Sequence, residues 1–228
     1  MNKDIEWSYI GNNGPDYWGS LCHEYSIATN GMRQSPINID SDNVYSATQS
    51  IDYHYEEDKY LIKSEKYTIS LYPLHEYKQY FVYENEKFYL EHIHFHVPSE
   101  HTIDNKRFSV EWHFVHKNIH KEYLVLAILS DVRNNSISSF ESLVTALNKK
   151  EKHLLLDISQ LITNKVREFY HYEGSLTTPP TVESVTWIIG KQIISIGSCS
   201  YGILNKNVNN NVRPIQRIND RKIKMLCK

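Results

Sequence analysis

The chain has few glycines and cysteines, and each scarcity argues against a class of structure. Only eight of 228 residues are glycine, and none lies between Gly31 and Gly174. The three cysteines, Cys22, Cys199 and Cys227, are widely spaced, which leaves no pair for a zinc knuckle or a CxxC redox motif. We therefore expect free thiols and a cytoplasmic location. The alternative is a secreted or periplasmic protein whose leader has been removed.

No part of the chain is strongly basic or continuously apolar. The 25 Lys and Arg residues and 27 Asp and Glu residues leave a net charge of -2, with no basic block to bind nucleic acid. The N-terminus lacks the apolar core of a signal peptide, and no segment approaches the roughly 18 apolar residues of a membrane helix. We expect neither a nucleic-acid nor a membrane partner. The oligomeric state is left open.

The chain is rich in short runs of β-branched and aromatic residues. Runs such as KYTISLY, FSVEWHFVH and EYLVLAIL are separated by polar turns such as ENEK and IDNK, which predicts strands. Two helices are expected, a short one at DISQLI and a longer one over SISSFESLVTALNKK with a cap at Asn135 or Ser136. Four apolar residues recur there at helical spacing: Ile137, Phe140, Val144 and Leu147. Without a repeat or linker, residues 1–228 read as one β-rich domain.

The stretch EHIHFHVPSEH, from Glu91 to His101, concentrates candidate metal ligands. Side chains alternate faces along a strand, so His92, His94 and His96 share one face, and the residues between them can enter the core. Neighbouring imidazoles on that face are about 6.6 Å apart, from a rise of roughly 3.3 Å per residue. Two neighbours can converge on one ion, whereas three in a row cannot easily do so.

A third ligand must then come from an adjacent strand, and SVEWHFVH offers His113 and His116. These two lie on opposite faces because they are three residues apart. We favour His113, because Glu111 shares its face and a ligating imidazole usually donates its other N–H to a carboxylate or carbonyl. The SEHTIDNKRF connection is short enough to pair the two strands. Three neutral imidazoles without a thiolate suit a catalytic Zn²⁺ with an open fourth position.

Five motifs in order give a more specific indication. HIHFHVPSEHT, VEWHFVH, EGSLTTPPTVESVTW, QSPINI and NVRPIQ together resemble the α-class carbonic anhydrases, over a stretch from Trp7 to about Arg221. The resemblance implies a mainly β single domain, with a central, twisted, mostly antiparallel ten-stranded sheet and a few short surface helices. It also implies zinc-dependent hydration of carbon dioxide to bicarbonate and a proton, and sensitivity to sulfonamides.

Carried over residue by residue, the resemblance implies the roles in the site. His94, His96 and His113 become the zinc ligands, with Glu111 and the Asn211 carbonyl supporting them. Thr177 and Glu100 become the pair that orients the zinc-bound hydroxide, because a threonine that donates to a carboxylate can only accept from the hydroxide. The expected substrate pocket consists of Val115, Val125, Leu176, Thr178, Val185 and Trp187.

Two positions in the expected cleft depart from the family pattern. His92 stands where the family commonly has glutamine, and we expect its imidazole to hydrogen-bond His94 rather than to compete for the metal. Tyr67 aligns with the histidine that passes protons from the zinc-bound water to buffer in many members. Because a tyrosine is poorly matched to that task at neutral pH, we expect slow proton transfer. His75 is a less favoured substitute for it.

A third departure concerns the disulfide of many secreted members, whose two positions are Ala28 and Thr181 here, in keeping with a cytoplasmic location. Two other functions compete with the enzyme. HFHVPSE also fits the H-x-H-x-x-x-E run of cupin metal sites, but the glycines that flank a cupin motif are missing. A non-catalytic binding protein on the carbonic anhydrase scaffold is the main alternative. The retained His, Thr and Glu set favours catalysis.

Overall fold

The computed structural model describes residues 5–133, 140–162, 166–208 and 210–228. Within these ranges no helix is long and apolar enough to cross a membrane. The cysteines at positions 22, 199 and 227 are all free thiols. The cytoplasmic location stays a prediction.

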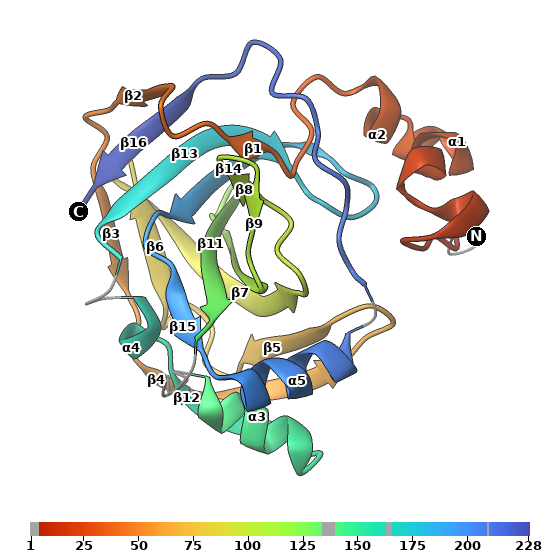
Figure 1. Ribbon diagram of the computed structural model, residues 1–228. Coiled ribbons are helices and arrows are strands. Elements are labelled where there is room, and N and C mark those ends of the chain that lie inside the picture. The colour runs from red at the N-terminus through yellow and green to blue at the C-terminus, as the bar shows by residue number, and fades with distance from the viewer. Residues whose placement is uncertain (1–4, 134–139, 163–165, 209) are drawn as a thin grey trace.

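Strands dominate the described chain (Figure 1). In chain order they are β1 (Asn38–Ile39), β2 (Val44–Ser46), β3 (Ile51–His54), β4 (Glu57–Ser64), β5 (Ile69–Pro73), β6 (Tyr80–Tyr83), β7 (Glu86–His96), β8 (Thr102–Ile103), β9 (Lys106–Arg107), β10 (Val110–Lys117), β11 (Tyr123–Val132), β12 (His153–Asp157), β13 (Glu168–Ser175), β14 (Glu183–Gly190), β15 (Ile194–Ile196) and β16 (Ile223–Cys227). The helices are α1 (Trp18–Leu21), α2 (Ile27–Asn30), α3 (Glu141–Asn148), α4 (Ser159–Ile162) and α5 (Ser198–Asn207). Short 3-10 turns cover Gly11–Asn13, Pro15–Tyr17 and His23–Tyr25.

One large mixed sheet organises the chain. Its main path runs β12-β4-β5-β7-β10-β11-β14-β13-β16-β2, and β3, β6 and β15 join it from the side to make thirteen strands in the described residues. Most pairs are antiparallel, but β11 runs parallel to β14 and β15, and β16 runs parallel to β2. The mainly β, mostly antiparallel architecture is confirmed. The expected ten strands correspond to the main path alone.

The two faces of this sheet carry different apolar clusters. Alternation along β10 sends Trp112 and Phe114 into the larger cluster, whereas Val115 belongs to the smaller one. Helices α3 and α5 pack together beside β5 and β12 (Figure 1), and Phe140, just before α3, stacks on Trp112 at 3.5 Å between ring centroids. The larger cluster is therefore closed by helices, while the smaller cluster lies on the face that carries the candidate site.

The two predicted helices are present with shorter bounds. Helix α3 buries Leu143, Val144 and Ala146 on the sheet, and α4 lies within the DISQLI stretch. The expected cap at Asn135 or Ser136 lies outside the described residues. Helix α5 was not predicted, because its apolar residues are too few to mark one face. It is held by the burial of Leu204 in the larger cluster.

Candidate active site

The site begins with the pairing of two central strands. Strands β7 and β10 are antiparallel, and their register sets His94 opposite His113 and His96 opposite Glu111. The pairing expected for these strands is present, although a small β8–β9 pair occupies the connection. Ile93 and Phe95 point into the larger apolar cluster, so the histidines between them face the other way. The alternation of side chains along β7 therefore directs the imidazoles of His92, His94 and His96 into one cleft.

Ring nitrogens of His94, His96 and His113 converge within 4.8 Å of one another. His113 Nδ1 lies 3.3 Å from His94 Nε2, and the buried His96 Nε2 has no hydrogen-bond partner among the residues that the structure describes. Burial lowers the pKa of His96 to about 4 and that of His94 well below the usual histidine range. The rings are therefore neutral at pH 7, with lone pairs free to bind a cation.

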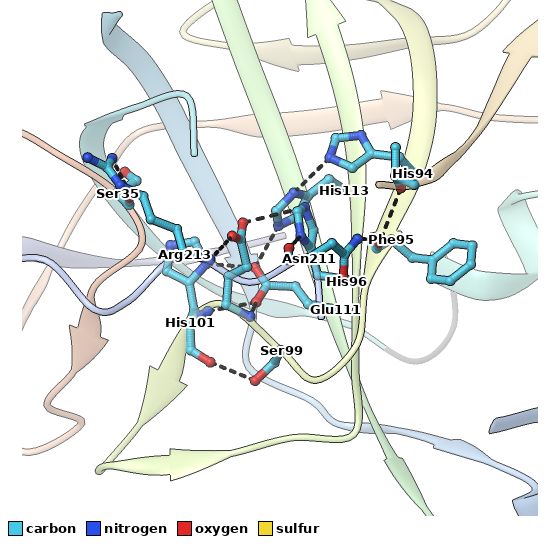
Figure 2. Close-up of polar contacts among 12 residues, drawn as sticks. Ser35, His94, Phe95, His96, Ser99, His101, Glu111, His113, Asn211 and Arg213 are labelled. Carbon is cyan, nitrogen blue, oxygen red and sulfur yellow. Dashed lines mark hydrogen bonds and ion pairs between the residues drawn. The ribbon is translucent and has the colours of Figure 1, made fainter. Parts of the chain in front are cut away.

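The Glu111 carboxylate is buried beneath this cluster and is the acceptor on which several hydrogen bonds converge (Figure 2). One carboxylate oxygen accepts from His113 Nε2 at 2.7 Å and from His101 Nδ1 at 2.6 Å. The other oxygen accepts from the backbone N–H groups of Glu100 at 2.8 Å and of His101 at 2.7 Å. Burial alone would raise the pKa of Glu111, but the two histidines outweigh it and hold that pKa well below its ordinary value.

An ionised Glu111 can only accept, so the proton of His113 is on Nε2 and its Nδ1 lone pair points toward the cluster. The same reasoning puts a proton on His101 Nδ1, leaving Nε2 to accept from the Tyr172 hydroxyl at 2.7 Å. Burial raises the pKa of Tyr172 well above its usual value, so that hydroxyl keeps its proton. Tyr172 in turn contacts the Ser35 hydroxyl at 2.7 Å. This chain of donors fixes the tautomer of His113.

A second group, His101, Glu111 and His113, also brings possible ligand atoms together. Both nitrogens of His101 and Nε2 of His113 already take part in the hydrogen bonds just described. We therefore assign this group to support and not to metal binding. His101, Tyr172 and Ser35 were missed as site residues from the sequence, since they come from distant segments and only the fold joins them.

Asn211 holds β7 from the C-terminal segment. Its carbonyl accepts from His96 Nδ1 at 2.5 Å, which leaves Nε2 of that ring facing the cluster. Its side-chain oxygen accepts from the Val97 N–H at 3.1 Å, and its amide donates to the Phe95 carbonyl at 2.9 Å. The sequence predicted the backbone contact with a ligand. Nothing in the sequence predicted the two hydrogen bonds of the Asn211 side chain, which hold the strand on both sides of His96.

Glu100 lies on the other side of the cluster and is fully buried. Its Oε1 accepts from the Arg213 N–H at 2.9 Å, while Oε2 is 3.4 Å from His96 Nε2 and has no hydrogen-bond partner in the described ranges. Burial raises the pKa of Glu100 to about 7, and the buried Thr177 hydroxyl acts in the opposite direction. The structure thus brings the expected Thr177 and Glu100 together. Arg213, a further contact of Glu100, was not predicted.

The hydrogen bond expected between His92 and His94 is absent, and that prediction is wrong. His94 Nδ1 is buried with no hydrogen-bond partner among the described residues. Instead the two rings stack, with centroids 5.2 Å apart and planes 25° from parallel. Rings arranged face to face cannot direct an in-plane N–H at each other. His92 also lies outside both groups of convergent ligand atoms, so the geometry does not place it among the candidate ligands.

Tyr67 lines the cleft, but its hydroxyl is already occupied. It donates to the Trp7 carbonyl at 3.0 Å, and its ring packs against Trp7 and Tyr9. His75 does not enter the cleft; its exposed ring contacts Asp58 at 2.5 Å on another part of the sheet. In this structure, neither candidate proton carrier has a ring nitrogen or a free hydroxyl facing the three histidines.

The apolar residues expected to line the substrate pocket pack together beside the three histidines. Register places Val115 across from Val125, and Val125 across from Trp187. These three and Val185 are buried in the smaller apolar cluster, with Leu176 packed against it. Trp187 meets the His113 ring edge to face at 5.0 Å. Thr178 lines the open part of the cleft with His92, His94 and His96, around a volume of about 310 Å³.

Comparison with known proteins identifies the family. A family model described as eukaryotic-type carbonic anhydrase matches residues 13–226. The chain belongs to the alpha-class carbonic anhydrase family. A carbonic anhydrase of Neisseria gonorrhoeae is 32% identical over 94% of this chain and 86% of that protein. The α-carbonic anhydrase of Thermovibrio ammonificans, solved with the inhibitor sulfanilamide, has a TM-score of 0.89 and 30% identity over 97% of this chain and 100% of that chain.

One relative carries a different name. Dioscorin DB3L of Dioscorea polystachya is 31% identical over 96% of this chain and 85% of that protein. Membership of the carbonic anhydrase family supports an enzyme that acts on carbon dioxide and bicarbonate.

Proposed function

We propose that this carbonic anhydrase catalyses the reversible hydration of carbon dioxide to bicarbonate and a proton, with Zn²⁺ held by His94, His96 and His113. The observation that carries the proposal is the convergence of three ring nitrogens within 4.8 Å. The buried, unpartnered Nε2 of His96 fits a metal ligand, since a polar atom without a partner is costly to bury. Three neutral imidazoles and no thiolate are typical of catalytic zinc.

A zinc ion bound there would lower the pKa of a water molecule to about 7 and so supply a hydroxide nucleophile at neutral pH. The protein's own contribution begins with orientation. When ionised, Glu100 accepts a hydrogen bond from the Thr177 hydroxyl, so the threonine oxygen can only accept from the nucleophile. The Arg213 N–H and the burial of Glu100 hold the carboxylate in place.

The apolar wall supplies a place for the other reactant. The apolar surface formed by Val115, Val125 and Trp187 offers carbon dioxide a place next to the His113 ring. Water competes poorly for this surface because it finds no hydrogen-bond partner there. Attack on the carbon turns this apolar molecule into an anion. The anion is better solvated at the open side of the cleft, where Thr178 lies. The bicarbonate product is therefore expected to leave through this open side.

The proton must leave by another route. The Tyr67 hydroxyl donates to the Trp7 carbonyl, and a phenol is too weak both as an acid and as a base to relay protons well at neutral pH. We infer that proton transfer to buffer limits turnover.

One experiment tests the proposal. The purified protein is expected to contain one zinc per chain, to hydrate carbon dioxide in a stopped-flow pH-indicator assay, and to be inhibited by a sulfonamide. His96→Ala should lose both zinc and activity, whereas His54→Ala, at an exposed histidine on β3, should retain both. Stoichiometric zinc without hydration would favour the non-catalytic binding protein. Hydration that survives complete zinc removal would refute the assigned chemistry.

A further inference from the structure

The three candidate ligands are not supported alike. His113 donates to Glu111, and His96 contacts the Asn211 carbonyl. Within the described parts of the chain His94 has no such partner, and its buried Nδ1 is unpaired. Ligating histidines usually have a hydrogen bond that fixes the orientation of the ring. Something else must restrain the ring of His94.

A stack of side chains runs from the surface to that ring. His92 stacks on His94 with centroids 5.2 Å apart and planes at 25°, and Tyr72 packs on His92 at 5.5 Å and 32°. The Lys63 ammonium lies 4.4 Å from the centre of the Tyr72 ring. The Tyr72 hydroxyl donates to Glu65 at 3.0 Å. Tyr72 is therefore anchored at its ring and at its hydroxyl.

The sheet builds this stack from local register. Strands β5 and β7 pair with Leu71 opposite Ile93, which places Tyr72 across from His92 on the cleft face. Cross-strand aromatic pairs of this kind stabilise antiparallel sheets. Because His92 and His94 are two residues apart on β7, their rings project from the same face and meet. All three rings line the same cleft.

We infer that His92 and Tyr72 are positioning residues that hold the metal-ligand ring of His94 by stacking, in place of a hydrogen bond to its Nδ1. This inference rests on the proposed zinc site. His92 restricts rotation of the ring toward or away from the cluster, and Tyr72 acts through His92 by covering it from the neighbouring strand. The nitrogens of His92 stay outside the convergent ligand atoms, so its contribution is packing and not coordination.

The test measures Zn²⁺ affinity directly, by competition with a chromophoric chelator. An aromatic pair contributes enough to change a binding constant by about 3- to 10-fold. His92→Ala is therefore expected to weaken zinc binding by roughly that factor, whereas His92→Phe, which keeps a ring but has no nitrogen, should bind zinc within about twofold of the wild type. Tyr72→Phe keeps the ring and should also match the wild type.

Tyr72→Ala separates positioning from a general loss of stability. It is expected to weaken zinc binding about 2- to 5-fold in the wild type, by loss of an aromatic pair, and to add nothing in the His92→Ala background. The Co²⁺-loaded His92→Ala protein should show a shifted visible absorption spectrum, and His92→Phe should restore it. Tyr45→Ala is the matched control, because Tyr45 is an exposed tyrosine under a lysine ammonium outside the cleft.

The outcomes separate the two proposals. If wild-type protein binds no zinc, the proposed function and the stacking inference both fall. If it binds zinc and hydrates carbon dioxide, but His92→Ala keeps wild-type affinity and Co²⁺ spectrum, only the stacking inference falls. Equal losses in His92→Phe and His92→Ala would also overturn it, since the nitrogens of His92 would then be what matters. All variants are first compared with the wild type by circular dichroism.

Discussion

Replacing Glu111 with glutamine tests how the cleft sets the tautomer of a ligand. The carboxylate accepts four hydrogen bonds, two from imidazoles and two from backbone N–H groups. A glutamine amide of the same shape has one accepting oxygen and one donating nitrogen. Whichever way the amide is placed, two of the four donors face its NH₂ group instead of an accepting oxygen. Glu111→Gln therefore cannot preserve the network.

The two possible orientations of the glutamine amide disturb the network in different ways. With the amide nitrogen toward the backbone, two charge-assisted hydrogen bonds are lost, at about 1.5–3 kcal/mol each, or about 3–6 kcal/mol of unfolding free energy in total. With the nitrogen toward the imidazoles, His113 can adapt only by moving its proton to Nδ1. That proton then points at the three-histidine cluster, and zinc affinity should fall by about 10- to 100-fold.

The assay combines urea unfolding of the metal-free protein with chelator competition for zinc. Glu91→Gln, at an exposed glutamate on the same strand as two of the candidate ligands, is the control and should leave both quantities unchanged. At least one of the two losses must appear in Glu111→Gln. A variant with unfolding free energy within 1 kcal/mol and zinc affinity within threefold of the wild type, thresholds set from the magnitudes above, would refute the tautomer argument.

Three further predictions concern substrate, proton and pH. Val115→Tyr should fill the apolar pocket and reduce carbon dioxide hydration by at least about tenfold with zinc content unchanged, as measured by stopped flow and metal analysis. Added imidazole should accelerate wild-type turnover, and Tyr67→His should reduce that dependence; fast turnover that ignores buffer concentration would contradict it. Burial lowers the pKa of His171 to about 4 and that of His116 to about 3. Because both values lie below the unfolded value near 6.5, the folded state binds protons less readily. Stability should be full above about pH 6.5 and fall toward pH 4, by about 3 kcal/mol for His171; a flat urea midpoint over that interval would exclude it.

Local alternation made much of the site predictable. The period of two placed Ile93 in the core and His94 in the cleft, and the spacing between His113 and Glu111 predicted their contact. Long-range contacts were a different matter. Nothing in the sequence around Ser35 or Tyr172 indicates that they join His101, since these residues meet only when distant strands pair. The family motif placed Thr177 and Glu100 in the site, and the structure brings them together.

The error at His92 has a physical origin. His92 was expected to hydrogen-bond His94, because His113 completes the set of three candidate ligands without it. Side chains that project in parallel from a strand meet through their faces instead, which is the geometry observed. The parallel pairing of β11 with β14 could not be predicted from the local sequence either. It depends on which strands become neighbours in space.

The contacts of Asn211 have a consequence for biosynthesis. This residue ties down the strand that carries two of the candidate ligands, and the backbone of Arg213 holds Glu100 from the same segment. A ribosome makes the histidines of β7 more than a hundred residues earlier. Until the segment around position 211 has left the exit tunnel, His96 lacks its orienting carbonyl and Glu100 lacks its amide. For the proposed zinc site, we therefore expect metal uptake to be a late event, after translation has passed almost all of the sheet.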